Sequence, residues 1–179
     1  MAELQPIAEY VFECSWEICN KVGGIYTVVK TKAASMQSYY SNYILVGPYF
    51  KKKAEIEFEY LEPPKSFAKA FDVLAQEGII CHYGKWNIKS EPVTILIEFL
   101  AASDHINDIK KELWDRYQVD SIRAGWEFEE PVLWSWYVAR MIEEVSKNLG
   151  SNNVVSHWHE WLAGAGLLYL RSKDSSVKT

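Results

Sequence analysis

A lysine and a pair of glycines stand where a β-rich run gives way to a helix-patterned run. Tyr10–Cys14 is rich in strand-forming residues, Lys21 is followed by Gly23 and Gly24, and an amphipathic segment begins at Ile25. Glycine lets the backbone approach a bulky ligand, and the first N–H groups of a helix lack internal partners and carry partial positive charge. With the charge of the lysine, this turn can hold a phosphate. A tight turn whose glycines serve only chain geometry is an equally good interpretation of these residues alone.

Two histidines form a second candidate site. His157 and His159 lie in the sequence HWHEW, directly after a predicted strand at 153–156. An uncharged histidine in such a loop can donate or accept a hydrogen bond to a ligand, although an ordinary packed histidine fits the spacing as well. Two histidines one residue apart can also reach one metal ion, but a zinc site needs further ligands, and His82 and His105 stand in no partnered motif. We therefore expect no metal site.

A pair of carboxylates precedes the longest helical pattern. Glu129 and Glu130 come directly before Pro131, which is expected in the first turn of that helix. Glu130 is a candidate for binding an acceptor substrate. A favourable interaction of both carboxylates with the helix N-terminus explains the pair equally well.

The glycine motifs do not match the common nucleotide-binding patterns. Lys21–Gly24 lacks the Gly-Lys-Ser/Thr of a Walker P-loop and the three spaced glycines of a dinucleotide-binding turn. Gly164 and Gly166 lie inside a helical pattern, where they favour close packing of the helix on a sheet. Nicotinamide cofactors are therefore not expected.

The composition predicts a soluble globular protein. The 179 residues are 49% hydrophobic and 15% aromatic, which allows a sizeable core. The net charge of -5, with no basic tail, argues against nucleic acid as the main partner. Three cysteines, an odd and sparse set, suit a reducing compartment. Met1–Glu9 does not have the pattern of a secretory signal, and the apolar stretch 162–170 is too short to span a membrane, so we expect a cytoplasmic protein with no membrane partner.

Strand and helix patterns alternate along the chain. Strands are predicted at 10–14, 43–46, 55–60, 79–83, 93–100 and 153–156, and helices at 25–40, 67–77, 103–117, 131–149 and 162–171, with Ser103 or Asp104 as an N-cap. This order predicts an α/β fold, a Rossmann-like and largely parallel sheet with helices on both faces. Both candidate loops follow strands, so they can share the rim at the carboxyl ends where ligands of such sheets bind.

Four segments, in order, resemble the glycogen synthases of the animal and fungal type and their microbial relatives. They are residues 16–28, with the core NKVGGIYTV, then VGPY at 46–49, ELWD at 112–115 and HWHEWLAG at 157–164. The resemblance covers nearly the whole chain. Four segments in the same order are a specific signal, whereas any one of them alone is weak.

The resemblance implies a GT-B architecture, in which two Rossmann-like lobes face a cleft. It implies a retaining glycosyltransferase that moves glucose from a nucleotide-glucose donor, UDP-glucose or ADP-glucose, to the non-reducing end of an α-1,4-glucan without a metal ion or cofactor. Lys21, Gly23 and Gly24 would face the donor phosphates and stabilise the charge on the departing nucleotide. His159 would be the catalytic histidine near the donor glucose, and Glu17 would help to bind sugar.

Members of this family are several times longer, and their second lobe holds most nucleotide contacts and a pair of catalytic glutamates. We therefore expect residues 1–179 to be an incomplete N-terminal Rossmann-like lobe, inactive alone, from a homo-oligomeric parent whose C-terminal nucleotide-binding lobe is absent here. One alternative is a non-catalytic α/β module that binds a nucleotide or a sugar. A metal hydrolase built on His157 and His159 is a weaker one.

Overall fold

The computed structural model describes residues 7–179, so the prediction that Met1–Glu9 is not a secretory signal falls largely outside the described residues. Six strands form one sheet in the order β3-β4-β5-β2-β1-β6. They are β1 (Tyr10–Cys14), β2 (Tyr43–Pro48), β3 (Phe58–Tyr60), β4 (Ile80–Trp86), β5 (Val93–Glu98) and β6 (Val154–Trp158). The pairs β5–β2, β2–β1 and β1–β6 are parallel, whereas β4 is antiparallel to both its neighbours. The predicted α/β fold with a largely parallel sheet is confirmed.

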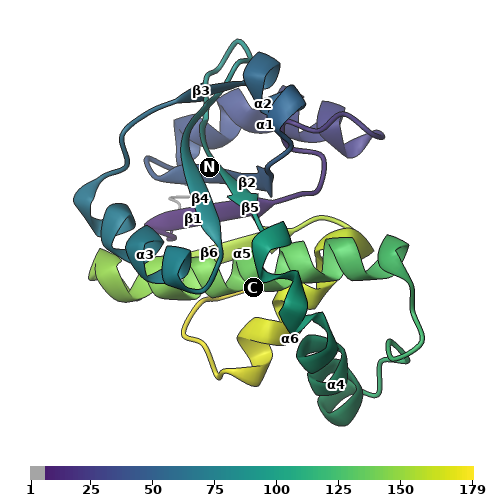
Figure 1. The fold of residues 1–179 in the computed structure, drawn as a ribbon. Helices are drawn as coiled ribbons and strands as arrows, with labels where there is room; N and C mark the ends of the chain where they lie inside the picture. Colours follow the sequence, from purple (N-terminus) through teal and green to yellow (C-terminus); the bar gives the residue numbers. More distant parts are fainter. Residues whose placement is uncertain (1–6) are drawn as a thin grey trace, which may run out of the picture.

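Helices cover both faces of the sheet (Figure 1). They are α1 (Ile25–Tyr39), α2 (Lys51–Glu57), α3 (Lys65–Gln76), α4 (Ile106–Tyr117), α5 (Trp126–Leu149) and α6 (Gly164–Ser172), with short 3-10 segments at Leu100–His105 and Trp161–Ala163. Helices α1 and α2 pack on one face, and α3, α5 and α6 pack on the other. None of the described helices has a stretch long and apolar enough to cross a membrane.

The side-chain alternation of the strands separates two cores. In β1, Val11 belongs to the core under α1 and α2, whereas Phe12 and Cys14 belong to the core under α3, α5 and α6. Successive residues of a strand point to opposite faces, so a strand buried on both sides reads as a continuous apolar run. Glu13 interrupts this run in β1 although it is fully buried.

The predicted strand 55–60 is wrong for its first half. Residues 51–57 form helix α2, and only Phe58–Tyr60 joins the sheet, at its edge. Alternation of charged and apolar residues suggested one buried face, but Ile56 is 75% exposed. Lysine, alanine and glutamate are good helix formers, and the turn starting from Phe50 supplies the first hydrogen bonds.

Boundaries elsewhere in the chain also differ from the prediction. Helix α4 begins at Ile106, after a 3-10 segment, and neither Ser103 nor Asp104 caps it. Helix α5 begins at Trp126, so Pro131 lies inside it rather than in its first turn. Strand β6 extends through Trp158, which shortens the loop predicted at 157–161.

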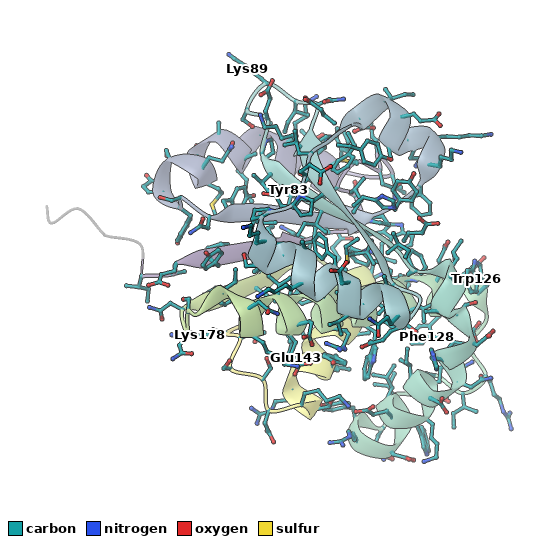
Figure 2. The ribbon with its side chains drawn as sticks, turned by 60° about the vertical axis from the view of Figure 1, so that its left-hand side comes forward. Tyr83, Lys89, Trp126, Phe128, Glu143 and Lys178 are labelled. Carbon is teal, nitrogen blue, oxygen red and sulfur yellow. The ribbon has the colours of Figure 1, made fainter. Side chains whose placement is uncertain are left out.

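The two ends of the sheet carry different groups. Trp126 and Phe128 lie at one end of the molecule and Lys178 at the opposite end (Figure 2). Lys178 forms a parallel bridge with Val155, so the residues after α6 run alongside β6. Phe128 stacks on Trp161, directly after β6, with ring centroids 6.5 Å apart. The start of α5 therefore adjoins the carboxyl-end rim.

We expect Gly166→Ala to destabilise the fold. A Cβ at Gly166 would lie 2.3 Å from the Trp158 ring and 2.7 Å from the carbonyl oxygen of Ser135, so α6 would have to move away from β6 and α5. The expected loss in the free energy of unfolding is about 1–3 kcal/mol, measured by urea denaturation. Gly164→Ala is the matched control, because a Cβ there meets no atom within 4 Å. Equal stability of the two variants would contradict the close packing.

Candidate active site

The loops that carry Lys21 and His159 leave adjacent strands at the same edge of the sheet. β1 and β6 are parallel, with Cys14 opposite Trp158 at their carboxyl ends. The backbone N–H of His159 donates to the carbonyl oxygen of Cys14 over 3.1 Å, which ties the loop after β6 to the end of β1. The prediction that the two loops share one rim is confirmed by this pairing.

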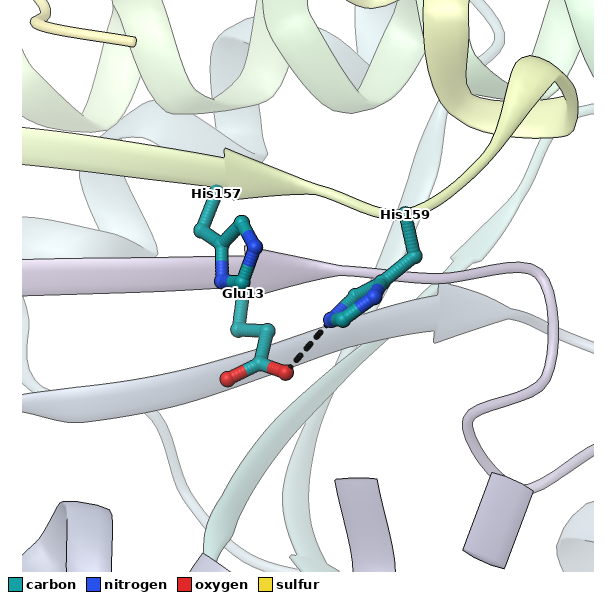
Figure 3. A group of neighbouring side chains, drawn as sticks. All are labelled: Glu13, His157 and His159. Atoms are coloured by element: carbon teal, nitrogen blue, oxygen red, sulfur yellow. Dashed lines mark hydrogen bonds and ion pairs between the residues drawn. The ribbon is translucent and has the colours of Figure 1, made fainter. Parts of the chain in front are cut away.

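Glu13 is a fully buried carboxylate just inside this rim. Its Oε1 accepts hydrogen bonds from His159 Nε2 at 2.6 Å and Lys32 Nζ at 2.9 Å, and its Oε2 accepts one from the Tyr43 hydroxyl at 2.6 Å. Figure 3 shows the His159 ring turned towards this carboxylate. The donors belong to the loop after β6, to α1 and to β2. A buried charge is stable only when it is paired and hydrogen-bonded, so this network fixes the three elements relative to one another.

These hydrogen bonds determine the protonation state of the network. Burial alone would raise the pKa of the Glu13 carboxyl group, but the hydrogen bonds from His159, Tyr43 and Lys32, with the charge of Lys32, lower it to about 2. The carboxylate is therefore ionised at neutral pH and can only accept. His159 must donate through Nε2, which leaves Nδ1 as the nitrogen that a ligand can use. Burial lowers the pKa of the neighbouring His157, which favours its neutral form.

The same cluster offers possible metal ligands. Glu13, His157 and His159 each place one ligand atom within 4.8 Å of the others (Figure 3). Zinc bonds of about 2.0–2.2 Å at tetrahedral angles separate two ligand atoms by roughly 3.3 Å. Here the Glu13 oxygen lies 2.6 Å from Nε2 of His159, a hydrogen-bond distance, and the ammonium group of Lys32 occupies the same oxygen. This donor set fits a hydrogen-bonded network better than a metal ion.

The N-terminus of α1 holds a carboxylate from within the chain. Oε2 of the buried Glu17 accepts hydrogen bonds from the N–H groups of Gly23 at 2.7 Å and Tyr26 at 3.0 Å. A negative charge stabilises a helix N-terminus, so Glu17 caps α1. A Cβ on Gly23 would lie only 2.8 Å from Oε1 of Glu17, so a larger residue at this position would collide with the carboxylate. The N–H groups of Gly24 and Ile25 have no acceptor among residues 7–179 and remain for a ligand.

Lys21, Gly23 and Gly24 are exposed on this loop. Lys21 Nζ lies 5.8 Å from the centroid of the Tyr26 ring, and Lys30 Nζ lies 5.7 Å from the same centroid. A Cβ on Gly24 would meet no atom within 4 Å. A positive charge and an unobstructed backbone therefore stand together beside the first turn of α1.

Each of the two rim loops contains a strained residue. Cys19 has φ 53°, and Glu160, directly after His159, has φ 62° and ψ 179°. Residues other than glycine rarely adopt these conformations, which cost of order 1–3 kcal/mol each and cluster at functional sites. Glu91, Gln118 and Asp174 also have positive φ, so it is the combination of strain with Lys21 and His159 that distinguishes these two loops.

Aromatic side chains form a floor beneath the rim. Trp16 directly follows β1. Its ring centroid lies 5.5 Å from that of Phe50 and 5.3 Å from that of Trp134, both in edge-on contacts, and 6.3 Å from that of Phe99. Phe50 follows β2 and Phe99 follows β5. The indole N–H of Trp134 is buried without a hydrogen-bond partner in the described part of the chain. This floor holds the ends of three parallel strands together.

The two glutamates predicted near α5 have different surroundings. Both lie within α5 rather than before it. Glu129 forms an ion pair with the buried Lys110 at 2.6 Å and so joins α5 to α4. Glu130 is half-buried, and burial raises its pKa. Among residues 7–179, Glu130 forms no hydrogen bond or ion pair with the rim residues, although Phe128 in the same turn stacks on Trp161.

A hollow of about 390 Å³ lies away from the rim, between α4, α5 and α6. Its lining includes Trp136, Tyr137 and Tyr169. Arg140 and Glu77 also line it and form an ion pair at 2.7 Å. The candidate site residues do not line this hollow. They lie instead at the open edge of the sheet.

Sequence reasoning missed the buried network behind His159. Glu13, Lys32 and Tyr43 come from three separate segments, and only the fold brings them together. One signal was available: a charged residue in the middle of the apolar run Tyr10–Cys14 needs a buried partner.

We expect Glu13→Gln to weaken the fold at neutral pH and to weaken it less at about pH 3. The folded-state pKa of about 2 lies below the ordinary 4.5, so the carboxylate stabilises the fold above about pH 4.5, and this contribution is lost as the pH falls towards 2. The shift corresponds to about 3 kcal/mol. Urea denaturation from neutral pH to about pH 3 measures the difference between wild type and variant. Glu59→Gln, at the exposed sheet edge, is the control; a pH-independent difference for Glu13→Gln would contradict the assignment.

Known proteins match the chain over nearly all of its length. The sequence profile described as glycogen synthase matches residues 13–179. The liver glycogen (starch) synthase of Mus musculus is 31% identical over 181 residues, which cover 99% of this chain and 26% of that protein. The glycogen (starch) synthases of Dictyostelium discoideum and Caenorhabditis elegans are each 34% identical, over 98% and 95% of this chain and 20% and 26% of their own lengths.

The chain therefore spans about a quarter of the length of the curated relatives it matches. The matched region contains both rim loops and the network of Glu13. The chain belongs to the glycogen synthase family.

Proposed function

We propose that this chain is the N-terminal, Rossmann-like part of a retaining GT-B glycosyltransferase. The complete enzyme transfers glucose from a nucleotide-glucose donor, UDP-glucose or ADP-glucose, to the non-reducing end of an α-1,4-glucan. The observation that carries the proposal is the meeting of two strained loops at the carboxyl ends of β1 and β6, one with Lys21 and the other with His159. Membership of the glycogen synthase family supports the choice of reaction.

The loop before α1 is the proposed seat of the donor phosphates. Lys21 supplies a full positive charge, and the N–H groups of Gly24 and Ile25 point from the helix N-terminus. Glu17 already occupies the N–H groups of Gly23 and Tyr26, so it shapes the seat. Gly23 acts indirectly, because it makes room for Glu17. These groups stabilise the negative charge that develops on the departing nucleotide.

His159 is the proposed contact to the donor glucose. Its Nε2 is held by Glu13, so Nδ1 is the nitrogen that faces a sugar hydroxyl. Glu130 is proposed to bind the acceptor near the start of α5, where Phe128 and Trp161 offer stacked aromatic faces. No metal ion or cofactor takes part in this proposal.

The rest of the proposal concerns the complete protein. A C-terminal lobe supplies most nucleotide contacts and closes the cleft over the rim. The parallel bridge between Val155 and Lys178 supports a sheet that continues beside β6. The enzyme is proposed to be cytoplasmic and homo-oligomeric, and the free thiols of Cys14, Cys19 and Cys81 suit a reducing compartment.

We expect Lys21→Ala and His159→Ala to lower kcat/KM of the complete synthase by about 100-fold or more, because each removes a group that acts on the reacting donor. Turnover is measured with UDP-glucose or ADP-glucose and glycogen. Lys30→Ala is the matched control for Lys21, since both ammonium groups lie near the same Tyr26 ring. His105→Ala, an exposed histidine elsewhere, is the control for His159.

Wild-type turnover in both site variants would contradict the proposed roles. The chain of residues 1–179 alone should not transfer glucose, and clear transfer by it would contradict the need for a second lobe. Donor binding without transfer by the complete protein would favour a binding module instead.

A further inference from the structure

Glu13 lies in a central strand, between β2 and β6, where a charge is least expected. It is fully buried, whereas Lys32 keeps 29% and His159 keeps 11% of their side-chain surface exposed. The carboxylate thus sits behind the histidine, inside the sheet, and the histidine lies between it and the rim. A substrate at the rim would reach the imidazole but not Glu13.

The carboxylate is saturated by donors that do not depend on substrate. Lys32 binds Oε1 and Tyr43 binds Oε2, so the direction of the carboxylate is fixed. The remaining lone pair on Oε1 accepts the hydrogen bond from His159. The backbone N–H of His159 is bound to Cys14, so both ends of this residue are anchored on β1. An imidazole anchored in this way has one tautomer and one ring orientation.

We propose that Glu13 is the positioning residue of His159, holding the imidazole in the Nε2–H form so that Nδ1 meets the sugar as a hydrogen-bond acceptor. The catalytic meaning of this inference rests on the proposed function. The tautomer and the orientation do not, because they concern the unliganded chain. An experiment can therefore distinguish failure of the positioning role from failure of the proposed function.

Nitrogen NMR of the histidine rings in the 179-residue chain tests the inference. In the wild type, Nε2 of neutral His159 should carry the proton, with a slowly exchanging N–H resonance, and Nδ1 should show the shift of an unprotonated nitrogen. Glu13→Ala should remove that resonance and give the tautomer mixture of the exposed His105. Glu13→Gln should retain it, because its amide oxygen can replace Oε1.

Tyr43→Phe is the matched control, since it removes another donor to the same carboxylate but not the bond to His159. The resonance should survive in this variant. A wild-type His159 that carries its proton on Nδ1 would overturn the inference without any variant. Stoichiometric capture of Zn²⁺ by the wild type, with loss of the N–H resonance, would overturn it in favour of a metal centre.

The complete synthase supplies a second readout. Glu13→Ala should lower kcat by about 100-fold with little change in KM, because a small misplacement of a reacting group has an effect of this size. Glu13→Gln should recover most of the lost turnover. Equal loss in the Ala and Gln variants, with the NMR signals as expected, would contradict the positioning role while leaving the proposed function intact.

Discussion

The buried carboxylate of Glu13 constrains everything at the rim. An ionised group inside a sheet requires donors on all its accessible lone pairs, and it obtains them from α1, from β2 and from the loop after β6. The three donors must therefore stay where they are for the fold to remain stable. The hydrogen bond between Glu13 and His159 therefore both stabilises the fold and fixes the geometry of His159.

A second buried carboxylate, that of Glu17, fixes the other rim loop. Glu17 binds the backbone at the start of α1, and this contact sets the path of the loop that carries Lys21. The cap also makes the helix N-terminus less positive than an empty one. The proposed phosphate seat therefore consists of Lys21 and the N–H groups of Gly24 and Ile25, not of the whole first turn. The positive φ angles of Cys19 and Glu160 show that both loops are held in backbone conformations that are unfavourable by themselves.

Patterns of local residues predicted most of the architecture. Apolar periodicity located the strands and the helices α1 and α3, and the order of the elements predicted the parallel sheet and the shared rim. The same reasoning failed at α2, where charge alternation mimicked a strand, and at the start of α5, where Pro131 suggested too late a beginning. The side chains of the rim were found one by one, but their partners were not. Glu13, Lys32 and Tyr43 meet through long-range pairing, which no local pattern encodes.

The central claim is that both rim loops hold one donor molecule. It is tested most directly by the structure of the complete synthase with a nucleotide-glucose donor bound. We expect the diphosphate to lie within hydrogen-bond distance of Lys21 Nζ and the Gly24 N–H group, and a glucose hydroxyl to bind Nδ1 of His159 while Nε2 remains bound to Glu13. A donor whose phosphates lie far from the start of α1, or whose binding releases His159 from Glu13, would contradict it.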